Sequence, residues 1–147
     1  MDNQEIINFL IKAKKSTYAS NGNPIKSSRP CSIDLSYSQG KFMYYDSYFG
    51  TNPFIGEEII LIDSNVIWSM NYIGRKLDDK FEYNFLKEAL MNVTQERPFR
   101  GPHTYESSGY TYKSSENGDF NWFQGEETIS FKGTEIYECR FHGGLIK

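Results

Sequence analysis

Cysteine and histidine are scarce in this chain, which has two of each among its 147 residues. Cys31 and Cys139 are too few for the disulfide framework of a small secreted protein. His103 and His142 belong to no Cys-x-x-Cys or His-x-x-x-His pattern, so a zinc site would need ligands from several separate segments. Gly143-Gly144 lacks the following helix of a phosphate-binding loop. We therefore expect no metal and no cofactor.

Basic charge and long apolar runs are also lacking. A net charge of −3 and a pI near 5.4 argue against nonspecific nucleic-acid binding by this domain alone. Three lysines near the end of the first helix, Lys12, Lys14 and Lys15, are expected to form a solvated helix end. No apolar run approaches membrane-spanning length, and no basic segment precedes an apolar stretch at the N-terminus. These features predict a cytoplasmic protein without a membrane partner.

An internal repeat is the strongest positive feature. Residues 54–74 align without a gap on residues 123–143. The positions that are identical in both copies are Phe54/Phe123, Gly56/Gly125, Glu57/Glu126, Glu58/Glu127, Ile60/Ile129, Ile67/Ile136 and Gly74/Gly143. The match predicts a duplicated unit.

Each copy of the repeat has the pattern of a β-hairpin, with alternating β-branched and aromatic residues on both sides of a turn. We place the two-residue loops at Ser64-Asn65 and Gly133-Thr134. This register puts Ser69 and Asn71 on the face of Glu58 and Ile60, and places Glu127 opposite Arg140. A slip of one residue would exchange the side chains between the two faces.

The remaining patterns predict two helices and further strands. Asp2 or Asn3 caps a helix to about Lys15, and a capping box over 79–82 opens a second helix to about Val93. Residues 41–49 and 110–113 are expected strands, residues 116–119 a turn, and residues 20–30 a loop that either covers a site or only connects elements. The fold class is α+β, a mostly antiparallel sheet with two helices in a single domain over 1–147. We expect pseudo-repeats over about 2–75 and 79–147, each a helix plus three strands.

Five motifs carry a resemblance to a known family. They are Asp46-Ser-Tyr-Phe-Gly50, Phe54-x-Gly-Glu-Glu58, Trp68-x-Met-Asn-Tyr72, Arg97-Pro-Phe-Arg-Gly-Pro102 and Phe141-His-Gly-Gly144. In this order they resemble a family of small bacterial proteins classed as a domain of unknown function, which also occurs C-terminal to helix-turn-helix regulator segments. The resemblance implies a bacterial, cytosolic origin and a link to transcriptional regulation. It implies no activity, cofactor or catalytic residue.

The function that these patterns favour is noncatalytic binding of a small molecule or a partner, because no nucleophile–base pair, metal spacing or phosphate loop is present. One alternative is an enzyme acting on a small polar substrate, with His142 and a carboxylate as acid and base. A second alternative is a dimerising interaction protein. Both faces of the first hairpin are apolar, so the face without helices needs the 20–40 segment, a second subunit or a ligand as its cover.

The candidate site is a pocket between the two halves. An apolar floor with a few convergent polar groups is typical of ligand pockets. The expected lining residues are Asp46, Glu58, Asn71, Arg140 and His142, with Trp68 or Trp122 as an aromatic wall. The alternative is that these groups satisfy one another in a closed polar cluster. Separately, Arg97 and Arg100 either clamp an anion or hold the carbonyl groups of their own loop.

Overall fold

A computed structural model describes residues 2–20 and 22–147 of the chain. Asn21, in the loop expected over 20–30, lies outside the described residues. In chain order the elements are α1 (Asn3–Ser16), the 3₁₀ turn η1 (Tyr18–Ser20), β1 (Ile33–Gln39), β2 (Phe42–Gly50), β3 (Phe54–Ile62), β4 (Asn65–Lys76), α2 (Tyr83–Leu90), β5 (Thr104–Ser107), β6 (Tyr110–Asp119), β7 (Trp122–Phe131) and β8 (Thr134–Leu145).

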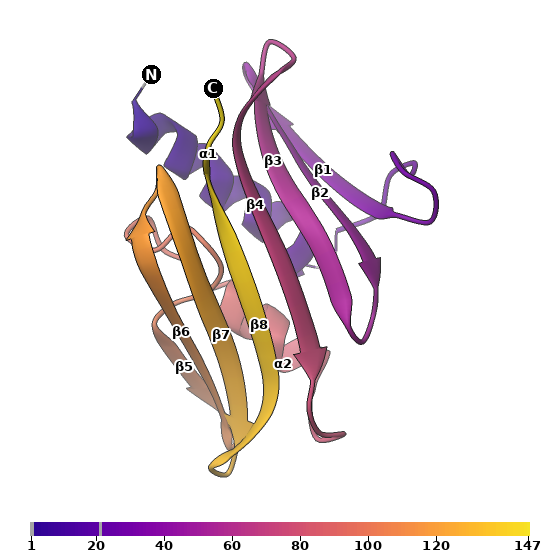
Figure 1. The fold of residues 1–147 in the computed structure, drawn as a ribbon, viewed down its shortest axis with the longest axis vertical. Helices are drawn as coiled ribbons and strands as arrows, with labels where there is room; N and C mark the ends of the chain where they lie inside the picture. The colour runs from indigo at the N-terminus through magenta and orange to yellow at the C-terminus, as the bar shows by residue number, and fades with distance from the viewer. Residues whose placement is uncertain (1, 21) are drawn as a thin grey trace.

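The strands form one antiparallel sheet in the order β1-β2-β3-β4-β8-β7-β6-β5 (Figure 1). We call residues 2–76, with α1 and β1–β4, the first half, and residues 77–147, with α2 and β5–β8, the second half. The two halves meet where β4 pairs with β8. The α+β class with an antiparallel sheet and two helices is confirmed, but each helix is followed by four strands rather than three.

Of the two helix caps predicted from the sequence, one is present in the structure and one is not. Asp2 caps α1 as expected, because its side-chain oxygen accepts a hydrogen bond from the Gln4 amide at 3.0 Å. The capping box expected at 79–82 does not form. Glu82 is the N-cap of α2 without a side-chain cap bond, because the preceding residues turn through a bond from the Phe81 amide to the Asp78 carbonyl.

The turn expected at 116–119 is also wrong, since these residues extend β6 to Asp119.

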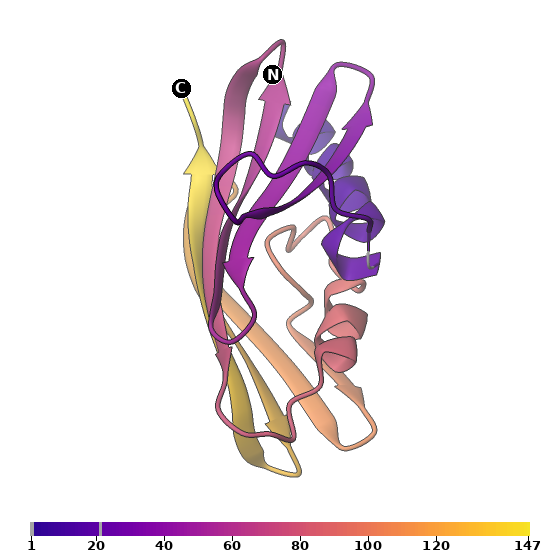
Figure 2. The same ribbon diagram turned by 90° about the vertical axis from the view of Figure 1, so that its right-hand side faces the viewer.

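Both helices lie on the same side of the curved sheet, which wraps around them (Figure 2). We call the side facing the helices the inner face and the opposite side the outer face. Because strand side chains alternate, one set of residues in each strand is buried beneath the helices. The largest of these that are fully buried are Trp68, Tyr44, Tyr112, Tyr137 and Phe141.

The hairpin register differs from the predicted one by one residue. The turns are Asp63-Ser64 and Lys132-Gly133, all at positive φ. A β-bulge then adds one residue to each returning strand, Ile67 in the first half and Ile136 in the second. Glu58 therefore lies opposite Met70, and Glu127 opposite Cys139.

The outer face has little cover. Within the described part of the 20–40 segment, residues 25–32 bond to the buried Asp34 and to Ser47, at the edge of the sheet. Further in, Met43, Ile55 and Ile73 remain 43%, 51% and 48% exposed. No helix in the described ranges is long and apolar enough to cross a membrane.

Candidate functional site

The residues predicted to line one pocket lie on opposite faces of the sheet. Asp46, Glu58 and Trp68 belong to the inner face and are buried. Asn71, Arg140 and His142 point to the outer face, because the register of β4 and β8 is shifted by the bulges. The seven residues therefore do not share one cavity.

Neither tryptophan forms the expected wall between the halves. Trp68 is fully buried in the core, where its ring stacks on Phe120 and Phe123 at centroid distances of 5.5 and 6.0 Å. Trp122 lies at the start of β7 on the outer face and is 81% exposed.

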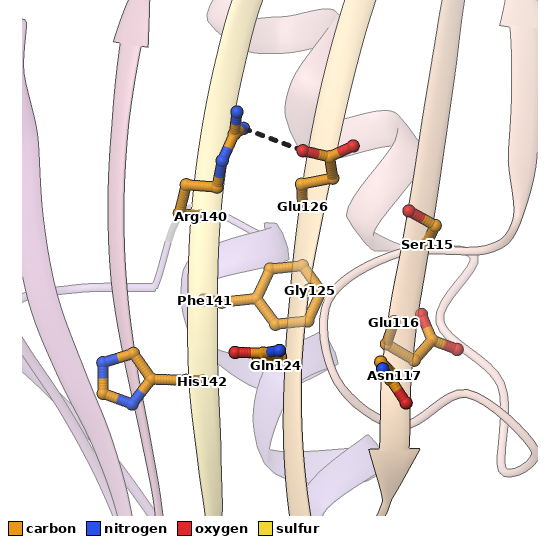
Figure 3. A pocket seen from close by; sticks show the side chains of 9 residues that line it. All are labelled: Ser115, Glu116, Asn117, Gln124, Gly125, Glu126, Arg140, Phe141 and His142. Carbon is orange, nitrogen blue, oxygen red and sulfur yellow. Dashed lines mark ion pairs between the residues drawn. The ribbon is translucent and has the colours of Figure 1, made fainter.

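A shallow outer hollow of about 470 Å³ lies over β6, β7 and β8 and contains two of the predicted residues (Figure 3). Arg140 reaches across to Glu126, with an Nη1–Oε2 distance of 3.3 Å, so this neighbour takes the place predicted for Glu127. Figure 3 shows the ring of His142 directed away from the carboxylates of Glu116 and Glu126. The outer hollow is polar, and both members of the Arg140–Glu126 pair are about half exposed.

Beneath the helices lies a cluster of buried ionisable side chains that the sequence did not predict. Lys14 Nζ is 2.5 Å from Glu58 Oε2 and donates to the Phe99 carbonyl at 2.6 Å. The expectation of a solvated Lys14 is wrong, since it is 5% exposed. Its position four residues after the buried Leu10 was the available signal, because residues i and i+4 share a helix face.

Arg100 and Glu127 form the second buried pair. Arg100 binds the carboxylate through two nitrogens, with Nη2–Oε1 at 2.6 Å and Nε–Oε2 at 3.2 Å. The hydroxyls of Tyr112 and Tyr137 donate to the same carboxylate at 2.6 and 2.8 Å. Burial acts to raise the pKa of Glu127, but Arg100 and these hydrogen bonds outweigh it and hold the pKa below its ordinary value.

The two arginines of the predicted anion clamp both bind carboxylates of the chain itself. Arg97 pairs with Glu116 at 2.6 Å and also donates to the Ser114 carbonyl at 2.8 Å. Arg100 is occupied by Glu127. Both groups thus tie the 97–102 loop to β6 and β7.

Asp46 is the third carboxylate in this buried cluster. It lies beside Glu58 in the sheet register, and its Oδ1 accepts a hydrogen bond from the Tyr72 hydroxyl at 2.6 Å. Burial, together with the neighbouring Glu58 carboxylate, raises the pKa of Asp46 to about 7. Its charge therefore changes near neutral pH.

Next to this cluster is a hollow of about 190 Å³ that we call the aromatic hollow. It lies between the halves, with η1, β2, β3 and β4 on one side and α2 on the other. The Tyr83 hydroxyl of α2 donates to the Thr51 carbonyl in the β2–β3 loop, and so closes one wall. Five aromatic residues line the hollow, Tyr18, Tyr48, Phe54, Tyr72 and Tyr83, together with Lys87. Of these, Tyr48, Phe54 and Tyr72 fall in motifs singled out above.

The cysteines and histidines show no arrangement for catalysis or metal binding within the described residues. Cys139 is buried in the core, and burial raises the pKa of its thiol to about 12, so the nucleophilic thiolate is suppressed. Cys31 is exposed. Among residues 2–20 and 22–147, no three His, Cys, Asp or Glu side chains group closely enough to hold a metal ion.

Comparison with protein families gives one match. A family described as a domain of unknown function, DUF5680, matches residues 46–146. The chain belongs to this family. No curated protein and no solved structure matches the chain. The DUF5680 match includes β2 from Asp46 onward and every later helix and strand, and therefore most of the walls of the aromatic hollow.

Proposed function

We propose that this chain is a noncatalytic module that binds a small molecule in the aromatic hollow. The observation that carries the proposal is an open cavity walled by aromatic rings from both halves, next to a buried ionic cluster. Ligand pockets combine such apolar walls with a few polar groups that fix orientation. Buried charges with perturbed pKa values gather at functional sites, since their desolvation is costly.

The size of the hollow limits the ligand. At about 190 Å³ it is smaller than the roughly 300–1,000 Å³ of sites for drug-sized molecules. We propose a ligand of few heavy atoms held between α2 and the β2–β3 end of the sheet. A bacterial, cytosolic origin and a role in transcriptional regulation are part of this proposal, and rest on the resemblance of the five motifs.

A thermal-shift screen with a fragment library tests the proposal. Fragments that raise the Tm of the wild-type chain are expected to lose their effect in Tyr48→Leu, which removes one ring of the hollow. Tyr45→Leu is the matched control, because Tyr45 is half-buried on the outer face of the same strand. If the Tm shifts persist in Tyr48→Leu but vanish in Tyr45→Leu, the ligand binds elsewhere and the proposal fails.

An enzyme using His142 with a carboxylate is the first alternative. The outer hollow brings His142 within one cavity with Glu116 and Glu126, which favours this reading. The direction of the His142 ring away from both carboxylates counts against proton transfer between them (Figure 3). Turnover of a small polar substrate that is abolished by His142→Ala would support the enzyme over the binding module.

A dimerising interaction protein is the second alternative. Ile55 and Ile73 are directly paired across β3 and β4, and both are about half exposed on the outer face. Exposed apolar patches of this kind mark interfaces in many proteins. A second copy of the chain is the partner that this alternative names.

We also propose that the two halves arose by duplication of one helix-plus-strands unit within a single domain. The bulged residues Ile67 and Ile136 occupy equivalent positions in the repeat. Their carbonyls accept equivalent bonds from the residue that follows each central strand: Ile146 N, just after β8, donates to Ile67 O at 3.0 Å, and Leu77 N, just after β4, donates to Ile136 O at 2.7 Å. This reciprocal exchange is the pattern expected for halves related by a pseudo-two-fold axis.

A further inference from the structure

The ionic cluster beneath the helices contains one carboxylate more than it contains cations. Lys14 pairs with Glu58, and Arg100 pairs with Glu127. Asp46 is 1% exposed and forms no salt bridge within the described residues. An unpaired buried carboxylate is costly to ionise, because the surrounding protein replaces water poorly. When Asp46 is ionised, the fold therefore holds at this point a negative charge that no salt bridge balances.

The aromatic hollow lies immediately next to this charge. Tyr72 connects the two, since its hydroxyl donates to Asp46 at 2.6 Å and its ring lines the hollow. Tyr48, two residues after Asp46 on the same strand face, forms another wall. Asp46 is thus behind the wall of the hollow and reaches it through the Tyr72 hydroxyl. At such short range in a poorly polarisable interior, its charge acts on anything bound there.

Two rings of the hollow already contact a cation of the chain itself, Arg100. The guanidinium carbon of Arg100 is 5.1 Å from the centroid of the Tyr72 ring and 5.9 Å from that of Tyr18. Electron-rich ring faces attract cations within about 6 Å. Arg100 is bound by both oxygens of Glu127, and its attraction for the Asp46 carboxylate is weaker than the repulsion from Glu58.

We propose that the aromatic hollow binds a small organic cation, an ammonium group with apolar substituents, whose charge is balanced by Asp46. This inference rests on the proposed function and names the ligand class for the same site. The aromatic rings surround the substituted ammonium, and the carboxylate behind Tyr72 supplies the opposite charge. Lys87 lines the α2 side and acts against a cation there, so its removal should strengthen binding.

Isothermal titration with an isosteric pair tests the charge requirement. Choline carries a quaternary ammonium, and 3,3-dimethylbutan-1-ol has the same shape without the charge. The full-length wild-type chain is expected to bind choline at least roughly tenfold more tightly than the alcohol. Benzyltrimethylammonium serves as a second cationic probe with an aromatic substituent.

Three substitutions separate Asp46 from general effects on the fold. Asp46→Asn keeps an acceptor for the Tyr72 hydroxyl and is expected to weaken choline binding roughly tenfold, to the level of the alcohol. Lys87→Met is expected to strengthen choline binding without changing the affinity for the alcohol. Glu57→Gln is the matched control, because Glu57 is on the adjacent strand but on the outer face, and it should leave choline binding unchanged.

Each outcome has a distinct meaning. Equal binding of choline and the alcohol, both lost in Tyr48→Leu, would overturn the inference and leave the proposed function standing. Absence of binding by choline and benzyltrimethylammonium, while screened neutral or anionic fragments bind in the hollow, would overturn it as well. If no probe and no fragment responds to Tyr48→Leu, both the inference and the proposed function fail. If Asp46→Asn does not fold, the isosteric pair decides, since equal affinities of the wild-type chain for choline and the alcohol contradict the inference.

Discussion

At the scale of single residues, equivalent glutamates in the two halves differ in what they bind. Glu58 binds a lysine of α1, whereas Glu127 binds an arginine and two tyrosine hydroxyls. The neighbouring glutamates, Glu57 and Glu126, lie on the outer face. The repeated Glu-Glu pairs thus place one carboxylate in the core and one on the surface in each half. The buried member cannot lose its partner without leaving an isolated charge in the core.

Arg100→Ala is expected to destabilise the fold by about 3–5 kcal/mol, because it leaves the Glu127 carboxylate buried without its cation. Urea unfolding followed by circular dichroism measures the change. Arg140→Ala is the control, since its pair with Glu126, the neighbour of Glu127 on β7, is about half exposed and should contribute less than about 1 kcal/mol. Similar losses in the two variants would mean that Arg100 contributes no more than a surface ion pair.

Asp46 should make stability depend on pH in the direction opposite to that of an ordinary ion-paired carboxylate. Its pKa is raised from an ordinary value of 3.8 to about 7 in the folded chain, by burial and by the neighbouring Glu58 carboxylate, so the folded state holds the proton more tightly. Its favourable contribution is complete below pH about 4 and is lost as the pH rises through about 7. The ionisable groups that face it are Lys14 of α1, Tyr18 of η1, Tyr44 and Tyr48 of β2, Glu58 of β3, Tyr72 of β4, and Arg100.

Relative to the wild type, Asp46→Asn should therefore gain stability between pH 5 and pH 8. Urea unfolding at the two pH values measures this difference, and comparison with the wild type removes the contributions of other groups to first order. Asp79→Asn, at a fully exposed aspartate, should show no such gain. A flat difference for Asp46→Asn across this range would contradict the raised pKa. The same titration predicts that choline binds more tightly at pH 8 than at pH 6.

At the scale of elements, each hairpin packs an aromatic ring over a glycine on the neighbouring strand. A Cβ at Gly56 would be 2.4 Å from the Tyr72 hydroxyl oxygen, and a Cβ at Gly125 would be 2.4 Å from Phe141 Cζ. The rings of Phe54 and Phe123 fill the equivalent spaces over Gly74 and Gly143. Glycine is required at these positions because the rings occupy the volume of a side chain.

Gly56→Ala and Gly125→Ala are each expected to destabilise the fold by about 1–3 kcal/mol through overpacking. The measurement is again urea unfolding. Gln124→Ala, one residue away on the exposed face of β7, should change stability by no more than about 0.5 kcal/mol. If one glycine tolerates alanine and the other does not, the halves do not share this packing, and the duplication proposal loses support.

At the scale of the whole molecule, the two faces of the sheet differ in how far they are covered by other parts of the chain. Both helices cover the inner face (Figure 2). On the outer face, Met43, Ile55 and Ile73 are about half exposed. The helices therefore account for the apolar residues on the inner face of the first hairpin. They do not account for those on its outer face.

If the outer face binds a second copy, the wild-type chain should be a dimer in light scattering at micromolar concentration. Ile55→Lys should then convert it to a monomer, because the ammonium would be buried in the interface. Thr128→Lys, on the polar outer face of the second half, is the control and should leave the dimer intact. A monomeric wild type would remove the interaction alternative and leave the aromatic hollow unaffected.

The sequence by itself determined the α+β class, the antiparallel hairpins and the helix stripes, because these depend on local periodicity and on turn residues. The identical Ile67 and Ile136 were visible as a repeat, but their role as bulges was not. A bulge changes strand pairing without any distinctive local pattern. Because each bulge adds one residue to its strand, Asn71, Arg140 and His142 lie on the outer face instead of the predicted inner face.

Only the tertiary structure decided the site. The aromatic hollow joins η1, β2, β3, β4 and α2, which are distant in the chain, and no spacing rule connects Tyr18 to Tyr83. Asp46 and Glu58 were predicted as site residues, and they do meet, but with Lys14 and Arg100 rather than with His142. Partners in a buried ionic cluster are selected by distance and desolvation, which exist only once helices and sheet are packed together.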